Sequence, residues 1–129
     1  SVTTFELIPR SALELVRQHV AGAADPFGRT HAWYVLTEAS LPQADSDLAS
    51  RLEAALAAAL ESGHAEDVLI AATLGQREAF WKLRESIPEA QTREGASLKH
   101  DISVGTRELP AFIDEAGAMV QRLVAGLRI

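Results

Sequence analysis

The chain has 129 residues, and 47% of them are hydrophobic, which is enough to build one domain with a core of its own. Its formal charge of -6 argues against a nucleic-acid partner, because neutralising phosphates needs Lys and Arg gathered on one face. The sequence has no cysteine, which excludes disulfides and thiol chemistry, and it has neither a signal-peptide pattern nor the ~18 continuous apolar residues of a membrane span. We expect a cytoplasmic protein without a membrane span.

The first half of the chain predicts two strands that alternate with two helices. Residues 2–8 are rich in β-forming side chains and are followed by a proline, and residues 32–39 have a similar composition. A helix over 11–20 lies between them and precedes a loop that contains glycine and proline. Over 43–62 a leucine recurs at every fourth position, which predicts a helix with one apolar stripe. The leucines of this stripe are Leu48, Leu52, Leu56 and Leu60.

The second half of the chain repeats this alternation. Residues 67–73 form an apolar run of strand length, and a helix over 76–87 follows, which Pro88 ends. Residues 98–104 alternate as a strand does. A long amphipathic helix is expected from about Arg107.

The fold class follows from this order of strands and helices, which permits either a parallel sheet or an α+β sandwich. The strand over 98–104 places Lys99, Asp101 and Ser103 on one face, so one face of the sheet is expected to be open. We therefore predict an α+β, ferredoxin-like layered domain, with a mostly antiparallel sheet and helices on one face. We expect it to form a single domain over 1–129 and to be a truncated piece of a longer protein.

Arg84 is the first candidate for a binding role. It lies four residues after Phe80 and three before Ile87, so a helix places its guanidinium on the side of two large apolar residues. A cation held there needs a carboxylate or phosphate partner, because an unpaired buried charge costs several kcal/mol. The partner can be a ligand, or it can be a nearby Glu that pairs with a snorkelling Arg.

Lys99 is the second candidate, because an ammonium on an open sheet face can bind an anionic ligand or simply pair with Asp101. His100 points with the apolar set and is expected to be a partly buried histidine rather than a base or metal ligand. The four histidines are dispersed, and the sequence shows neither a Gly-rich phosphate loop nor a nucleophile elbow. From these residues we predict no catalytic, cofactor-binding or metal-ligating residue in this chain.

Two runs carry a resemblance to a known family. They are Trp-Lys-Leu-Arg-Glu at 81–85 and Leu-Lys-His-Asp-Ile-Ser at 98–103, within FWKLRESIPEAQTREGASLKHDISVGTRELPAFI. With the FEL at 5–7 and the EAS at 38–40, they resemble the C-terminal, substrate-side (cap) domain of the FAD-linked oxidases that include D-lactate, glycolate and D-2-hydroxyglutarate dehydrogenases. The resemblance covers essentially the whole chain.

The resemblance implies a fragment of an FAD-dependent D-2-hydroxy-acid dehydrogenase. An N-terminal FAD-binding domain of the full-length parent would hold the flavin, which takes the hydride, and this fragment would bind no cofactor. The resemblance also implies that Arg84 and Lys99, which match the substrate-holding Arg and Lys of the hydroxyglutarate-type members, hold the carboxylate of a small 2-hydroxy acid over the flavin. The family pattern also implies a metal-binding pair of histidines beyond Ile129, so the parent could carry a divalent metal. Pro88 stands where the hydroxyglutarate-type pattern offers a hydroxyl side chain for the substrate. The isolated chain is expected to be inactive, because the flavin and the metal-binding histidines would belong to other parts of the parent.

A second hypothesis comes from a different class of protein. A free-standing ferredoxin-like module could use Arg84 and Lys99 for a small acidic effector, or an exposed sheet edge for homodimerisation. The reading frame around this chain discriminates the two hypotheses, because a neighbouring flavin domain would exclude the module.

Overall fold

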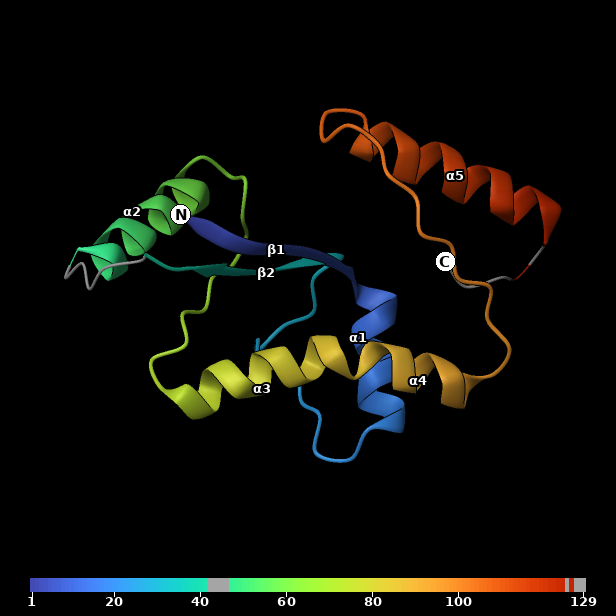
Figure 1. Ribbon diagram of the computed structural model, residues 1–129, viewed down its shortest axis with the longest axis horizontal. Coiled ribbons are helices and arrows are strands. Elements are labelled where there is room, and N and C mark those ends of the chain that lie inside the picture. Colours follow the sequence, from blue (N-terminus) through green and yellow to red (C-terminus); the bar gives the residue numbers. More distant parts are fainter. Residues whose placement is uncertain (42–46, 125, 127–129) are drawn as a thin grey trace. The chain divides into compact units, whose positions relative to one another are not determined.

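The computed structural model describes residues 1–41, 47–124 and 126. It divides into two units, residues 1–94 and residues 95–129. The described residues combine an antiparallel sheet with helices (Figure 1), which confirms the predicted α+β class. The single domain over 1–129 stays a prediction.

The sheet of the first unit pairs β1 (Val2–Pro9) with β2 (Trp33–Ala39). Both strands lie where the sequence predicts them. The strands are antiparallel, and Ile8 stands opposite Tyr34 in the register. Both side chains are buried, so this sheet face carries the core.

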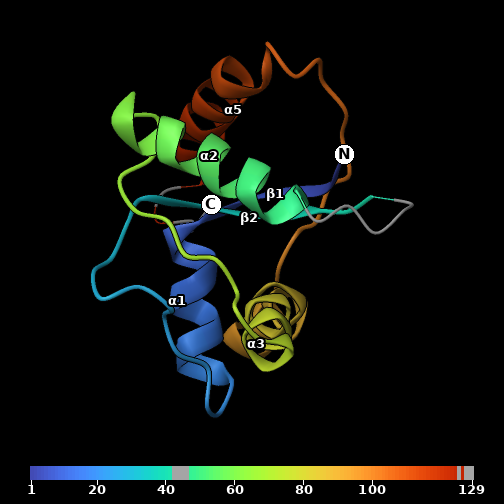
Figure 2. The ribbon, with the colours of Figure 1, turned by 90° about the vertical axis from the view of Figure 1, so that its left-hand side faces the viewer.

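The core of the first unit forms where α1 (Arg10–His19) packs beside the sheet and against α4 (Ile87–Glu94). Figure 2 shows α1 and α3 (Leu74–Glu85) on the same side of the strands. Apolar residues of α1 fall on its packed face because they are spaced three and four apart. The buried apolar residues of the two clusters are Ile8, Ala12, Leu13, Leu15, Val16, Tyr34 and Ala90. Leu83 and Ile87 pack against both clusters, which joins α3 and α4 to the same core.

The predicted helices are present, with shifted ends. The Leu-striped helix is α2 (Leu48–Glu61), and the part of its prediction at 43–46 lies outside the described residues. The helix predicted over 76–87 ends at Glu85, before Pro88, as expected. Pro88 then stands in the first turn of α4, a helix that the sequence analysis does not predict. Proline is tolerated there because the N–H groups of the first helical turn have no partner within the helix.

Two predicted strands are wrong. Neither 67–73 nor 98–104 forms a strand, so the described sheet has two strands rather than those of a complete ferredoxin-like layer. A strand needs a hydrogen-bonded neighbour, and the alternation of apolar residues in one segment does not show whether a neighbour is in place. His100 was predicted to be partly buried, but it is exposed and lies in a segment without regular structure.

The second unit contains α5 (Leu109–Leu123), preceded by residues 96–105 without regular structure. The amphipathic helix predicted near Arg107 is therefore confirmed, with its start two residues later. Pro110 stands in its first turn. No helix within the described ranges is long and apolar enough to cross a membrane.

Candidate functional site

One face of α3 carries the polar side chains that meet the sheet. Arg77, Trp81 and Arg84 stand at positions i, i+4 and i+7, which places them in one row along a helix. The row faces two glutamates of the sheet, Glu6 on β1 and Glu38 on β2. The site is thus a helix face with two guanidinium groups opposite two carboxylates.

Glu38 holds the first half of this row tightly. The Arg77 guanidinium donates two-pronged hydrogen bonds to the Glu38 carboxylate, with Nη2 at 2.9 and 3.0 Å and Nε at 3.2 Å. The indole Nε1 of Trp81 donates to the same carboxylate at 2.9 Å. These donors favour the charged form, so the hydrogen bond from Trp81, followed by that from Arg77, lowers the pKa of Glu38 below its ordinary value.

Glu6 holds Arg84 more loosely. A single nitrogen, Nη2, approaches both oxygens of the Glu6 carboxylate, at 3.3 and 3.4 Å. The two side chains, Arg84 and Glu6, remain 39% and 33% exposed. Of the two partners expected for Arg84, a ligand or a nearby Glu, the structure shows the Glu. The Nε and Nη1 groups of Arg84 donate to no residue that the structure describes.

Lys99 belongs to the second unit and lies in the segment without regular structure. Its side chain is exposed, and it pairs with neither Asp101 nor another residue in the described ranges. Arg84 belongs to the first unit and Lys99 to the second, so the proximity of the two side chains stays a prediction.

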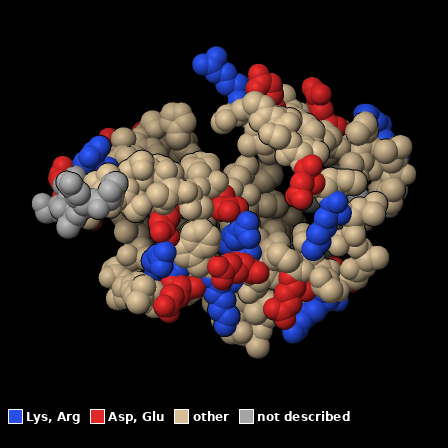
Figure 3. Space-filling view, in the orientation of Figure 1, with Lys and Arg blue, Asp and Glu red and all other residues tan. Residues whose placement is uncertain are grey.

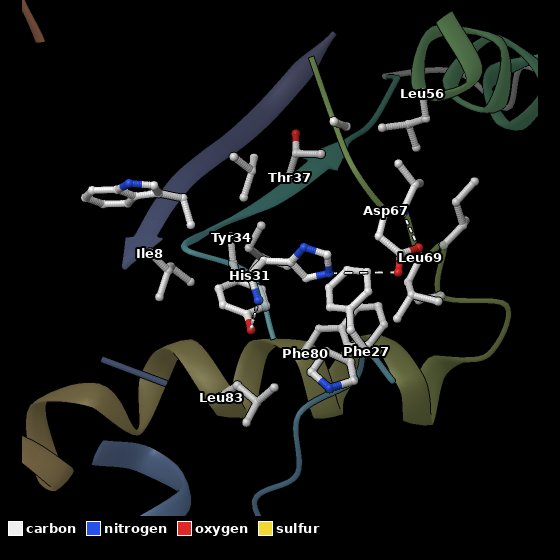
Figure 4. A pocket seen from close by; sticks show the side chains of 18 of the residues that line it. Ile8, Phe27, His31, Tyr34, Thr37, Leu56, Asp67, Leu69, Phe80 and Leu83 are labelled. Atoms are coloured by element: carbon white, nitrogen blue, oxygen red, sulfur yellow. Dashed lines mark hydrogen bonds and ion pairs between the residues drawn. The ribbon is translucent and has the colours of Figure 1, made fainter. Parts of the chain in front are cut away.

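A cavity of about 770 Å³ lies in the first unit beside the sheet (Figure 4). Residues of β2, α2, α3 and the segment 64–71 line it, and most of these side chains are apolar. Leu56, Leu69 and Phe80 contribute from three of these elements, and Arg77 and Trp81 reach it from the α3 row. The unpaired segment 67–73 therefore borders a space next to β2.

His31 anchors the segment 64–71 to the cavity wall. Its Nδ1 lies 2.9 Å from Glu66 Oε2, and its Nε2 lies 3.9 Å from Asp67 Oδ2 (Figure 4). Its backbone N–H donates to the Tyr34 hydroxyl at 3.1 Å, and Tyr34 in turn donates to Asp25. The hydrogen bond with His31 lowers the pKa of Glu66. This cluster was not predicted from the sequence, because His31 and Glu66 are 35 residues apart and no local motif connects them.

The cavity does not fit a flavin dinucleotide. Its polar lining includes the carboxylates of Glu38, Glu66 and Asp67, which repel a pyrophosphate, and the guanidinium of Arg77 is already held by Glu38. Over the described residues, no cluster of three or more His, Cys, Asp and Glu side chains could hold a metal ion. On the face shown in Figure 3, Lys and Arg side chains lie among Asp and Glu side chains rather than in one basic area.

These features define an α+β protein in which helix α3 places a partly exposed arginine, Arg84, beside the sheet. The family model for the C-terminal domain of FAD linked oxidases matches residues 1–127, and the chain belongs to this family. This confirms the resemblance found in the sequence.

The curated relatives include D-2-hydroxyglutarate dehydrogenases. The mitochondrial enzyme of Arabidopsis thaliana is 31% identical over 114 residues, which cover 88% of this chain and 20% of that protein. The enzyme of Xanthomonas citri pv. viticola is 35% identical over 116 residues, 90% of this chain and 24% of that protein. The mitochondrial enzyme of Rattus norvegicus is 32% identical over 108 residues, 84% of this chain and 20% of that protein. The chain thus spans between a fifth and a quarter of the length of these relatives.

Proposed function

We propose that this chain is the substrate-side domain of an FAD-dependent D-2-hydroxy-acid dehydrogenase and that Arg84 and Lys99 hold the carboxylate of its substrate. The relatives named above favour D-2-hydroxyglutarate over D-lactate and glycolate as the acid. A separate FAD-binding domain of the parent protein would supply the flavin, which accepts the hydride. A divalent metal, if the parent carries one, would be held outside the described residues.

The observation that best supports this proposal is that Arg84 is partly exposed and only weakly paired. Its guanidinium lies on a packed helix, is partly exposed and is held through one nitrogen only, so it is able to donate two parallel hydrogen bonds to the planar carboxylate of a substrate. Arg77, on the same face, is already engaged through two nitrogens. Lys99 adds an exposed ammonium that pairs with no described carboxylate, which suits it to an anionic ligand.

The proposal is tested in the full-length flavoenzyme that contains this chain. Replacing Arg84 or Lys99 with Ala removes a charge-assisted hydrogen bond, so KM for D-2-hydroxyglutarate should rise roughly 10- to 100-fold. Flavin content, measured by absorbance, should stay unchanged. Steady-state kinetics with D-2-hydroxyglutarate, D-lactate and glycolate in parallel also identifies the preferred acid.

Lys82→Ala is the matched control, because Lys82 is an exposed cation of the same helix outside the Arg77, Trp81 and Arg84 row. It should leave KM unchanged. The proposal is contradicted when Arg84→Ala and Lys99→Ala leave KM for all three acids unchanged, or when they remove the flavin.

A further inference from the structure

We propose that Glu6 is a resident carboxylate that occupies Arg84 in the absence of substrate and competes with the substrate carboxylate for it. This inference rests on the proposed function, in which Arg84 holds the acid. Glu6 would then lower the affinity of the site, and the substrate would displace it from the guanidinium on binding.

The geometry of the two arginine pairs on α3 supports an exchangeable contact at Glu6. Charge-assisted N–H···O bonds are usually about 2.7–2.9 Å long, and the Arg77 to Glu38 contacts approach this range. The contacts from Arg84 to Glu6 are longer, at 3.3 and 3.4 Å, and use one nitrogen. A carboxylate that engages the fork of Arg84 through two nitrogens would therefore make the better bonds.

Glu6 is also free to leave. Arg84 is the one hydrogen-bond or ion-pair partner that its carboxylate has among the described residues. Its side chain is already 33% exposed, so rotation away from Arg84 moves the charge into water at little desolvation cost. Glu38 cannot take its place, because Arg77 and Trp81 hold that carboxylate with three donor groups.

Electrostatic repulsion prevents Glu6 and the substrate carboxylate from binding the Arg84 guanidinium together, so the two carboxylates compete for it. With Glu6 in place the guanidinium is neutralised, and a second carboxylate beside it meets the repulsion of the first. A neutral amide at position 6 removes both the competing partner and the repulsion. Because a partly exposed pair is a weak interaction, the gain should be about two- to fivefold in KM.

The test is Glu6→Gln in the full-length flavoenzyme, with kcat, KM for D-2-hydroxyglutarate and flavin content measured together. We expect KM to fall about two- to fivefold with kcat and flavin content unchanged. An unchanged or raised KM overturns the proposal, since a residue that merely orients Arg84 or supports the fold would weaken binding when replaced. Glu6→Asp, whose shorter side chain withdraws the carboxylate, should also lower KM, and it provides the test if the Gln variant does not fold.

Glu14→Gln is the matched control, because Glu14 also forms an exposed ion pair in the first unit, with Arg10 at 2.6 Å. It should leave KM unchanged, and a fall equal to that of Glu6→Gln would overturn the proposal as a general charge effect. The effect of Glu6→Gln should also vanish in the Arg84→Ala background. An unchanged KM in Arg84→Ala alone refutes the proposed function, whereas a raised KM there with no fall in Glu6→Gln refutes the competition alone.

Discussion

At the scale of single residues, the two glutamates of the sheet differ in how firmly they hold their arginines. Glu38 receives hydrogen bonds from both Arg77 and Trp81, whereas Glu6 meets one nitrogen of Arg84. The sequence predicts that Arg84 needs an acidic partner, because its helix places it beside apolar residues. It does not identify Glu6 as that partner, because the two residues are 78 positions apart and come together through the packing of α3 on β1.

The Glu38 contacts predict a change in acid stability. The folded-state pKa of Glu38 is lowered, first by the hydrogen bond from Trp81 and then by Arg77. Its contribution to stability is therefore fully present above the unfolded-state pKa near 4.5 and is lost as pH falls through the lower folded-state pKa. Trp81→Phe should raise the pKa of Glu38 towards 4.5 and narrow this pH window. NMR titration of the Glu38 carboxyl carbon in the original protein and in Trp81→Phe measures this change in pKa.

Glu66 is the internal reference for this titration. The hydrogen bond with His31 lowers its pKa, and it lies outside the Trp81 contact, so Trp81→Phe should leave it unchanged. A Glu38 pKa that is the same in both proteins would contradict the role assigned to Trp81.

At the scale of secondary-structure elements, helices were easier to predict than strands. The leucine stripe of α2 and the apolar spacing of α1 and α5 are properties of the segment itself, so they were visible in the sequence. The run 67–73 is as apolar as a buried strand, yet it lies beside the cavity without pairing to β2. Strand pairing depends on a distant partner, which a local pattern does not specify.

The start of α3 carries a local signal that was missed in predicting this helix. The Thr73 hydroxyl accepts a hydrogen bond from the Gln76 N–H at 3.2 Å, and the Gln76 side chain accepts in return from the Thr73 N–H at 3.2 Å. This capping box is the Thr-x-x-Gln pattern, which is recognisable from the sequence. It fixes where α3 begins and so the positions of Arg77 and Arg84 along the sheet.

Removing this cap should destabilise the chain. Thr73→Ala leaves a helix-end N–H without its partner, so the free energy of unfolding should fall by about 1 kcal/mol, as measured by urea denaturation. Thr92→Ala is the control, because the Thr92 hydroxyl donates to the Pro88 carbonyl within α4 and caps no helix end. Equal losses in the two variants would contradict a capping role for Thr73.

At the scale of the whole molecule, one face of the sheet in the first unit exposes apolar side chains suited to further packing. The sheet face opposite the α1 core carries Phe5, Leu7 and Val35, which are 69%, 40% and 49% exposed. Apolar patches of this kind mark surfaces for other protein segments. They support the proposal that a larger flavoenzyme surrounds this domain, and homodimerisation stays a prediction.

The most direct test of the role of Arg84 is a crystal structure of the full-length flavoenzyme with D-2-hydroxyglutarate bound. We predict a substrate carboxylate on Arg84, with nitrogen to oxygen distances of about 2.7–2.9 Å, and a Glu6 carboxylate turned away from the guanidinium. A substrate whose carboxylates lie elsewhere, while Arg84 remains on Glu6, would contradict this role.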